Sequence, residues 1–251
     1  MRRNQLREIW RTGQAANNCW LSLGHAFTAE LIAHQGWDSV TIDMQHGLAG
    51  HAELCAMLAA VSATNTVPLA RIAWNDPASA MRALDAGAYG VICPNVETRE
   101  ECEHFVRACR YAPMGYRSVG PLRAPLYAGS DYLSEANKTL LAVVQVETRK
   151  GLENVDQIAA VEGLDMIYIG PSDLGLSLGR EARADQTDRV VVAAIERILE
   201  AAKRAGRHAG IYCRNPDYAK GMMDKGFDFV TVTSDEGMIA AGALVARRFA
   251  R

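Results

Sequence analysis

An alternation of short apolar runs with helix-like segments, repeated eight times, constrains the fold of this chain more than any other feature. The runs are rich in β-branched residues and are bounded by Gly, Pro or charged residues, which is typical of strands buried in a parallel sheet. They span Cys19–Leu23, Val40–Met44, Val67–Ile72, Gly90–Pro94, Leu141–Glu147, Met166–Gly170, Ala209–Cys213 and Phe229–Thr233. Runs of this kind predict one large parallel sheet, either open or closed.

Most gaps between the runs carry the start and stop signals of a helix. Asp76 and Asn215 each stand before a proline, which gives a favoured N-cap followed by a favoured first helical residue. Thr98 and Glu101 have the spacing of a capping box. We expect helices from Thr28 to Gly36, from Asp76 to Gly87, from Thr98 onward, from Thr187 to Gly206, from Asn215 to Gly226, and from Ile239 to Phe249 after an opening at Ser234.

This order of elements predicts an α/β fold with a single (β/α)8 TIM barrel. The rival is an open doubly wound sheet, which more often stops at about five or six strands. No linker rich in Gly, Ser or Pro divides the sequence, so residues 1–251 are expected to form one domain. Two connections, 111–138 and 174–186, are long enough to be functional. The second is a candidate lid or substrate wall, whereas the first begins on the opposite side of the barrel and suits a subunit contact equally well.

The composition excludes several classes of protein. A formal net charge of -2 and an aromatic content of 7% provide no basic or aromatic face for nucleic acid or a membrane surface. No apolar stretch follows the basic start of the chain, so no secretory signal is expected, and no run is long enough to span a bilayer. The six cysteines form no C-x-x-C pair. We therefore expect a cytoplasmic protein with reduced cysteines.

Two carboxylates stand at the carboxyl ends of neighbouring predicted strands. Glu147 ends one run and Asp173 comes just past the next, and barrels build their sites at this end of the strands. Because like charges repel, the pair is best tolerated around a cation, which predicts a divalent metal site. Alternation places Gln145 on the same side of its strand as Glu147. The alternative is that both acids are solvated residues at helix starts, stabilised by the helix dipole.

Three further polar residues are expected at the same end of the barrel. Asp43 and His46 follow the second strand, and Arg71 lies in the third. A guanidinium cannot be neutralised, so a buried Arg71 needs an anion, either a ligand carboxylate or enolate or a salt bridge to Asp43 or Asp85. His46 taken alone is more often an ordinary loop histidine. No dinucleotide fingerprint, phosphate loop or zinc motif occurs in the sequence.

A set of short motifs resembles the HpcH/HpaI aldolase family. The motifs keep the family's order from about Cys19 to Asp235. They are Asp43-x-x-His46-Gly47, Pro68-Leu69-Ala70-Arg71, Asn75-Asp76-Pro77, Leu84-Asp85-Ala86-Gly87-Ala88, Pro94-Asn95-Val96, Gln145-Val146-Glu147-Thr148 and Gly170-Pro171-Ser172-Asp173-Leu174. The family consists of class II, metal-dependent aldolases acting on pyruvate-type 2-oxo acids. The resemblance implies a carbon–carbon lyase that cleaves or forms 4-hydroxy-2-oxo acids, with an aldehyde and pyruvate, or a related 2-oxo acid such as hydroxypyruvate, as the two partners.

The resemblance also implies a role for each matched residue. Glu147 and Asp173 would be the metal ligands, with Gln145 beside the metal, which would be Mg²⁺, Mn²⁺ or Co²⁺. Arg71 would bind the keto or enolate oxygen, where negative charge builds as the carbanion forms. A fixed positive charge at that oxygen is what the reaction requires of this residue.

The resemblance assigns the proton transfer to His46, because its reference pKa of about 6.5 suits an acid/base group. Asp43 and Asp85 would hold and polarise the ring of His46. The pocket wall implied by the family comprises Gly170, Pro171 and Ser172 around the pyruvate carboxylate, and Ile211 near the acceptor.

The family assembles as a hexamer, a trimer of dimers in which the last helix is exchanged between subunits, and the apolar segment Ile239–Phe249 is compatible with that assembly or with simple packing on the barrel. The sequence departs from the common pattern at Gln45, at Arg117-Ser118 and at Ser172, and residues 209–213 end in bulkier side chains. These departures leave the aldehyde unidentified.

Two alternatives to an aldolase remain open. A metal-dependent carbon–carbon lyase or decarboxylase acting on oxaloacetate or a malyl-type acid would use the same enolate site. A non-catalytic protein that binds a metal and a 2-oxo acid would retain the same residues. None of the five lysines lies inside a predicted strand, which disfavours an aldolase of the Schiff-base class.

Overall fold

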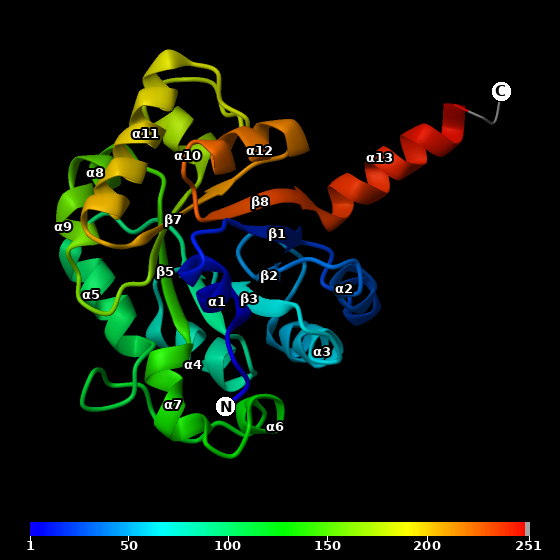
Figure 1. Cartoon of the computed structure of the whole chain (residues 1–251), viewed down its shortest axis with the longest axis vertical. Coiled ribbons are helices and arrows are strands. Elements are labelled where there is room, and N and C mark those ends of the chain that lie inside the picture. The colour runs from blue at the N-terminus through cyan, green and yellow to red at the C-terminus, as the bar shows by residue number, and fades with distance from the viewer. Residues whose placement is uncertain (249–251) are drawn as a thin grey trace.

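Every strand of the sheet runs parallel to its neighbours, and the first strand pairs with the last, so the sheet closes into a barrel (Figure 1). The computed structural model describes residues 1–248. The strands are β1 Ala16–Leu21, β2 Ser39–Asp43, β3 Val67–Arg71, β4 Gly90–Cys93, β5 Leu141–Val146, β6 Met166–Ile169, β7 His208–Tyr212 and β8 Phe229–Ser234. The prediction of a (β/α)8 barrel is confirmed, and the open sheet is excluded.

Helices surround the barrel and connect its strands (Figure 1). They are α1 Gln5–Arg11, α2 Ala26–Ala33, α3 His51–Val61, α4 Pro77–Asp85, α5 Arg99–Ala108, α6 Ala124–Ala128, α7 Tyr132–Thr139, α8 Arg149–Glu153, α9 Val155–Ala159, α10 Pro171–Ser177, α11 Arg189–Arg204, α12 Pro216–Asp224 and α13 Asp235–Arg248. No helix within the described residues is long and apolar enough to cross a membrane.

The helix starts with the clearest capping signals are confirmed. The Asp76 side chain accepts a hydrogen bond from the Ser79 amide at 2.9 Å, and Thr98 with Glu101 forms the predicted capping box. Two other starts were displaced. α2 begins near His25 rather than at Thr28, and α11 is capped by Asp188 rather than Thr187, because the Asp188 carboxylate accepts from two amides of the first turn.

A buried polar network explains why the beginning of β1 does not read as an apolar run. Asn18 is fully buried, its oxygen accepts from Ser39 and Thr41, and its nitrogen donates to Thr231 at 2.9 Å. Because these partners satisfy the amide, the strand can start at Ala16, before the apolar pattern begins.

Segment 111–138 was predicted as a long loop, and that prediction is wrong in part, since α6 and most of α7 lie within it. Several of its apolar side chains are exposed, most of all Leu122 and Leu126, with 89% and 87% of their surface accessible. The second long connection starts with α10 and then lines a hollow beside the pocket described below.

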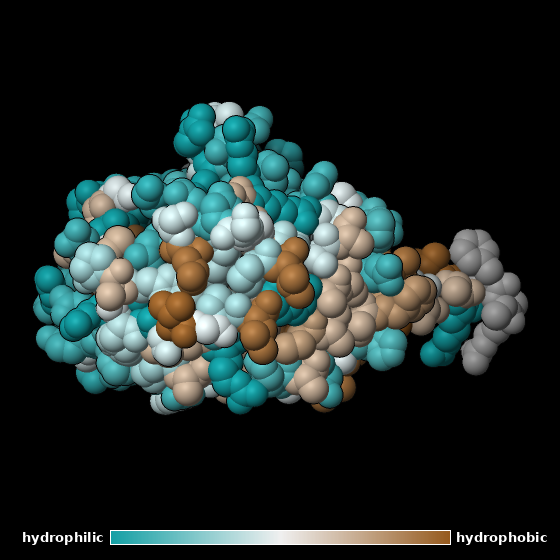
Figure 2. All heavy atoms as spheres, turned by 90° about the horizontal axis from the view of Figure 1, so that it is seen from below, coloured by the Kyte–Doolittle hydropathy of each residue, from teal (hydrophilic) through white to brown (hydrophobic). Residues whose placement is uncertain are grey.

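The last helix, α13, projects away from the barrel (Figure 1). It begins at Asp235, earlier than the predicted Ile239, and Phe249 lies outside the described residues. Every residue from 239 to 248 is exposed, including Ile239, Leu244 and Val245. Seen from below, apolar side chains lie along this helix (Figure 2).

Candidate active site

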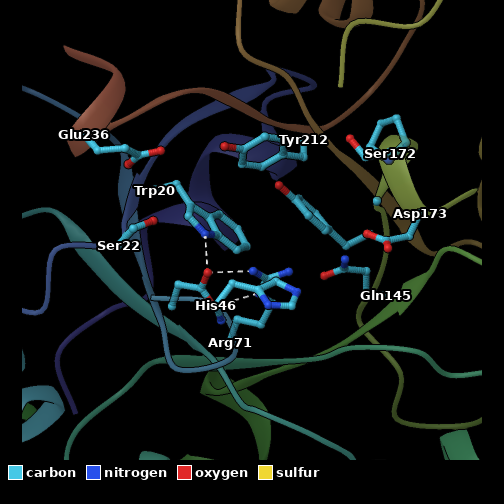
Figure 3. A pocket seen from close by; sticks show the side chains of 13 residues that line it. Trp20, Ser22, His46, Arg71, Gln145, Ser172, Asp173, Tyr212 and Glu236 are labelled. Atoms are coloured by element: carbon cyan, nitrogen blue, oxygen red, sulfur yellow. Dashed lines mark hydrogen bonds and ion pairs between the residues drawn. The ribbon is translucent and has the colours of Figure 1, made fainter. Parts of the chain in front are cut away.

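A pocket of about 420 Å³ opens at the carboxyl ends of the strands, within the size range of small-molecule sites (Figure 3). Strands from all around the barrel contribute to it, because their carboxyl ends converge there. The predicted site residues that line it are Asp43, His46, Arg71, Gln145, Gly170, Pro171, Ser172 and Asp173. Residues far apart in the sequence thus meet at the predicted end of the barrel.

Arg71 and Asp43 form a buried ion pair in the floor of this pocket. Arg71 donates to Asp43 through Nε at 2.9 Å and through Nη2 at 2.6 Å, and its guanidinium lies 4.8 Å from the centre of the Trp20 ring. Burial raises the pKa of Asp43, but the hydrogen bonds and charge of Arg71 outweigh it and hold that pKa below its usual value. The salt bridge between Arg71 and Asp43, one of the alternatives considered from the sequence, is therefore present. The third guanidinium nitrogen of Arg71, Nη1, makes no hydrogen bond to residues 1–248.

His46 lies on the exposed loop that follows β2 and lines the pocket (Figure 3). The Asp43 carboxylate accepts hydrogen bonds from the backbone amides of Gln45 at 2.9 Å and of His46 at 3.3 Å. Asp43 therefore fixes the loop that carries His46, whereas the expectation was that it would contact the imidazole ring. The ring itself makes no hydrogen bond to the described part of the chain.

Glu147 is buried at the end of β5, where its carboxylate accepts from the Asn95 amide at 3.0 Å and from Gln145 Nε2. Asn95 has a φ of 52°, a left-handed conformation that favours Asn among non-glycine residues and that aims this amide at the carboxylate. The side-chain amide oxygen of Gln145, Oε1, is buried without a hydrogen-bond partner within residues 1–248. An orphaned oxygen beside a buried carboxylate is an arrangement that a cation would satisfy.

Gly170 lies against both of these side chains, lines the pocket and leads into α10. A Cβ at this position would lie 2.2 Å from Glu147 Oε2 and 2.7 Å from Gln145 Nε2, so any larger residue would displace the ends of both side chains. α10 then begins with Pro171, and Asp173 follows in its first turn, exposed to the pocket. Asp173 is near enough to Glu147 for its charge to raise the pKa of that residue.

In the described part of the chain, Glu147 and Asp173 have no third acidic, histidine or cysteine side chain placed to share a metal ion with them. Within residues 1–248 no group of three or more His, Cys, Asp or Glu side chains is placed to hold a metal ion. The candidate metal centre therefore consists of two carboxylates and the Gln145 amide oxygen, which leaves coordination positions free for water and substrate.

Two predicted site residues lie elsewhere. Asp85 is the last residue of α4, which runs back from the carboxyl ends of the strands, so it lies at the opposite end of the barrel and accepts from Arg117 at 2.6 Å. Within one chain it does not reach His46. Ile211 is fully buried and does not line the pocket, because alternation along β7 directs the next residue, Tyr212, into it instead.

Five further residues line the pocket that the sequence interpretation did not single out, namely Trp20, Ser22, Tyr168, Tyr212 and Glu236. The Trp20 ring lies 5.8 Å from Tyr168 and 5.5 Å from Tyr212, so these aromatic rings form a continuous wall. A signal was available for Glu236, because it follows the eighth strand just as Asp173 follows the sixth. Trp20 and Tyr212 carried no such signal, since aromatic residues in strands are usually core.

The metal-free protein should lose stability as the pH rises through neutrality. Burial raises the pKa of Glu147 to about 7, with the charge of Asp173 adding to the shift, whereas in the unfolded chain the carboxyl ionises near 4.5. A raised folded-state pKa contributes stability that is present below the unfolded value and is lost as the pH rises through the folded one. The free energy of unfolding should fall by about 3 kcal/mol across this window.

Urea titrations between pH 5 and pH 8 in the presence of a chelator measure this slope. Glu147→Gln is the matched variant, because it keeps the shape of the side chain and removes its proton equilibrium. The Glu147→Gln variant should lack the part of the fall in the free energy of unfolding that comes from ionisation of Glu147. Parallel pH profiles for the two proteins would show that Glu147 does not hold a proton in the folded state.

Comparisons with known proteins identify the family to which the chain is similar. A family model described as HpcH/HpaI aldolase/citrate lyase matches residues 17–241. A hydroxypyruvate/pyruvate aldolase of Rhizorhabdus wittichii is 40% identical over 240 residues, covering 96% of each chain. A 4-hydroxy-2-oxo-heptane-1,7-dioate aldolase of Klebsiella pneumoniae is 34% identical, covering 98% of this chain and 94% of that one. The crystal structure of an HpcH/HpaI aldolase/citrate lyase family protein from Burkholderia cenocepacia superposes with a TM-score of 0.92 at 33% identity, covering 99% of each chain.

Proposed function

The chain belongs to the HpcH/HpaI aldolase/citrate lyase family and is an aldolase of the pyruvate type, a carbon–carbon lyase, and from that premise we propose how its site works. Membership confirms the predicted enzyme over a non-catalytic binding protein. The proposed reaction joins pyruvate, or a related 2-oxo acid such as hydroxypyruvate, to an aldehyde and cleaves the 4-hydroxy-2-oxo acid so formed. The observation that carries the proposed site is the buried Glu147 beside the unpartnered side-chain oxygen of Gln145, with Asp173 near enough to raise the pKa of Glu147. Gln145, Asp173 and Arg71 line the same pocket.

The donor set fits a hard divalent cation, namely Mg²⁺, Mn²⁺ or Co²⁺. Glu147 and Asp173 would hold the ion, with the Gln145 oxygen beside it. When bound, the ion would supply Lewis-acid stabilisation of the charge that develops on the keto oxygen. The raised pKa of Glu147 fits this role, since a buried carboxylate in need of a counter-charge favours a bound cation.

Arg71 would provide the fixed positive charge that the same oxygen requires. Its Nε and Nη2 are used by Asp43, which locks the guanidinium plane, and Nη1 remains for the substrate. Preorganised donors of this kind cost no reorganisation when charge develops. Gly170, Pro171 and Ser172 would line the place of the pyruvate carboxylate, with donors from the amides of Ser172 and Asp173, because Pro171 has no N–H.

His46 would accept and return the proton of the 4-hydroxyl group. We therefore expect His46→Ala to slow aldol cleavage by about 100-fold or more while affecting exchange of the pyruvate methyl hydrogens much less. The measurement compares steady-state cleavage with hydrogen–deuterium exchange of pyruvate in the same preparation, and His34→Ala, at the residue that follows α2, serves as a control. Equal losses in both assays would contradict a separate role for His46.

The direct test of the reaction is product analysis. Pyruvate and an aldehyde incubated with the metal-loaded enzyme should give a 4-hydroxy-2-oxo acid, detected by NMR, and a chelator should stop its formation. Release of carbon dioxide from oxaloacetate without aldol formation would favour the lyase or decarboxylase alternative instead.

We propose that the whole chain is one catalytic domain and that it assembles as a hexamer, a trimer of dimers, through α13. The helix has exposed apolar residues and little contact with its own barrel, and segment 111–138 exposes Leu122 and Leu126 at another face. Exposed apolar residues that lie together on a surface are typical of subunit interfaces. The two segments thus supply two distinct contact faces.

Disrupting the apolar face of α13 should lower the molecular mass in solution. We expect the double variant Leu244→Asp, Val245→Asp to convert the hexamer to smaller species, because charges buried in an apolar interface are costly. Sedimentation velocity measures the change, with Arg247→Gln as the control on the same helix. A monomeric wild-type protein would contradict this proposal.

A cytoplasmic location is part of the same proposal. All six cysteines are free thiols, and five of them are buried. Free buried thiols are usual in a reducing compartment.

A further inference from the structure

The pocket extends well beyond the residues proposed for the 2-oxo acid. Figure 3 shows Gln145 and Asp173 on one side of it and Ser22 and Glu236 on the other, with Trp20 and Tyr212 between them. A 2-oxo acid held at the first side would leave the second side for its reaction partner. Ser22 and Glu236 follow β1 and β8, which are neighbours in the barrel, so their proximity is fixed by the fold.

Glu236 is the charged group at this second side, and its carboxylate is incompletely satisfied. It is half-buried, and its Oε2 is shielded from solvent without a hydrogen-bond partner within residues 1–248. Burial raises the pKa of Glu236, but hydrogen bonding with Ser234 and Asp235 and the charge of Arg214 outweigh it, so the pKa lies below its usual value. Glu236 is therefore a carboxylate on the pocket wall whose acceptor capacity is not used up within residues 1–248, and an O–H donor in the pocket would add a hydrogen bond to it.

The aromatic wall between the two sides of the pocket suits a short carbon chain. The rings of Trp20 and Tyr212 meet at an interplanar angle of 86°, and such faces pack well against C–H groups. Beyond Tyr212 the pocket continues into a second hollow of about 460 Å³, which shares Ser172, Tyr212 and Glu236 with the first. There is thus room for an aldehyde of several carbons.

We propose that Glu236 selects the aldehyde acceptor by accepting a hydrogen bond from one of its hydroxyl groups, so that the enzyme favours short hydroxylated aldehydes over apolar or carboxylate-terminated ones. This inference rests on the proposed aldolase function and deepens it. Ser22 lies beside Glu236 and can donate or accept to a second hydroxyl.

Both competing classes of aldehyde interact less favourably with the Glu236 carboxylate than a hydroxylated aldehyde does. An apolar chain removes water from the carboxylate without replacing its hydrogen bonds, and sites built around a substrate hydroxyl discriminate strongly against analogues that lack it. A terminal carboxylate would face the charge of Glu236 at short range, which is repulsive in a partly desolvated pocket. Arg183 and Arg214 also line the second hollow, and a preference for a carboxylate-terminated aldehyde is the result expected where their charges outweigh that of Glu236.

The experiment measures kcat/KM for aldol addition of pyruvate to glyceraldehyde, propanal and succinic semialdehyde with the metal-loaded enzyme. Glyceraldehyde and propanal have the same carbon number and differ in two hydroxyls. We expect wild-type enzyme to favour glyceraldehyde over propanal by about 100-fold and Glu236→Ala to reduce this ratio at least tenfold. Glu236→Gln keeps an acceptor oxygen and should retain most of the ratio while using succinic semialdehyde about tenfold better than wild type.

Comparing ratios within each variant cancels the intrinsic reactivity of the aldehydes and any general loss of activity. Exchange of the pyruvate methyl hydrogens, measured without an aldehyde, reports on the proposed function separately, and Glu200→Gln on the exposed face of α11 serves as a control. An unchanged glyceraldehyde-to-propanal ratio in Glu236→Ala, or a wild-type preference for succinic semialdehyde, overturns the inference while exchange is intact. Loss of exchange in the wild type would instead overturn the proposed function.

Discussion

Glu147→Ala and Asp173→Ala should each abolish metal binding and lower kcat/KM for aldol cleavage by about 1,000-fold or more, while the barrel remains folded. The physical reason is that the described chain offers only these two carboxylates and the Gln145 oxygen at this end of the pocket. Removing either acid leaves too few anionic ligands to hold a divalent ion.

Isothermal titration with Mn²⁺ measures the loss of affinity, and circular dichroism verifies that the fold is retained. Glu153→Gln, an exposed carboxylate on α8, is the control for the general effect of removing an acid near the barrel rim. Unimpaired cleavage by either alanine variant after the metal has been stripped would refute the assignment of these ligands.

Arg71→Lys should lower kcat/KM by about 100-fold, although charge is conserved. The planar guanidinium makes two hydrogen bonds to Asp43, stacks over Trp20 and keeps a third nitrogen free. A lysine ammonium is a point charge that cannot satisfy Asp43 with two parallel bonds and also reach the substrate from the same place. Much of the loss is expected in the KM for the 2-oxo acid.

Steady-state kinetics with the 2-oxo acid as the varied substrate measure this effect. Arg82→Lys, on the exposed side of α4, is the matched control for the same exchange of side chains. Near-normal turnover by the Arg71→Lys variant would show that catalysis does not require the planar guanidinium with its several hydrogen-bond donors.

The fold could be predicted from the sequence because each strand is buried on both faces and therefore reads as an apolar run. The exceptions have physical causes. The start of β1 is polar because Asn18 is satisfied inside the barrel by Ser39, Thr41 and Thr231. The short helices α6, α8 and α9 have five residues each, too few for helical periodicity to show.

From the residues themselves, the clearest signal for the site was a charged residue at or just past a strand end. Glu147, Asp173 and Arg71 stand out in this way; Asp173 and Arg71 line the pocket, and Glu147 is buried beside Gln145, which also lines it. Asp85 was misplaced because the direction of its helix, not its motif, decides which end of the barrel it reaches. Ile211 was predicted to line the pocket, whereas its neighbour Tyr212 does so, because side chains one residue apart along a strand point to opposite faces.

The most direct test of the account is hydrogen–deuterium exchange of the pyruvate methyl group, followed by NMR, with a divalent metal present and again after chelation. The account predicts exchange with the metal, loss of exchange on chelation, and recovery when the metal is restored. Absence of exchange under both conditions would contradict enolate formation in this pocket, which is the central claim.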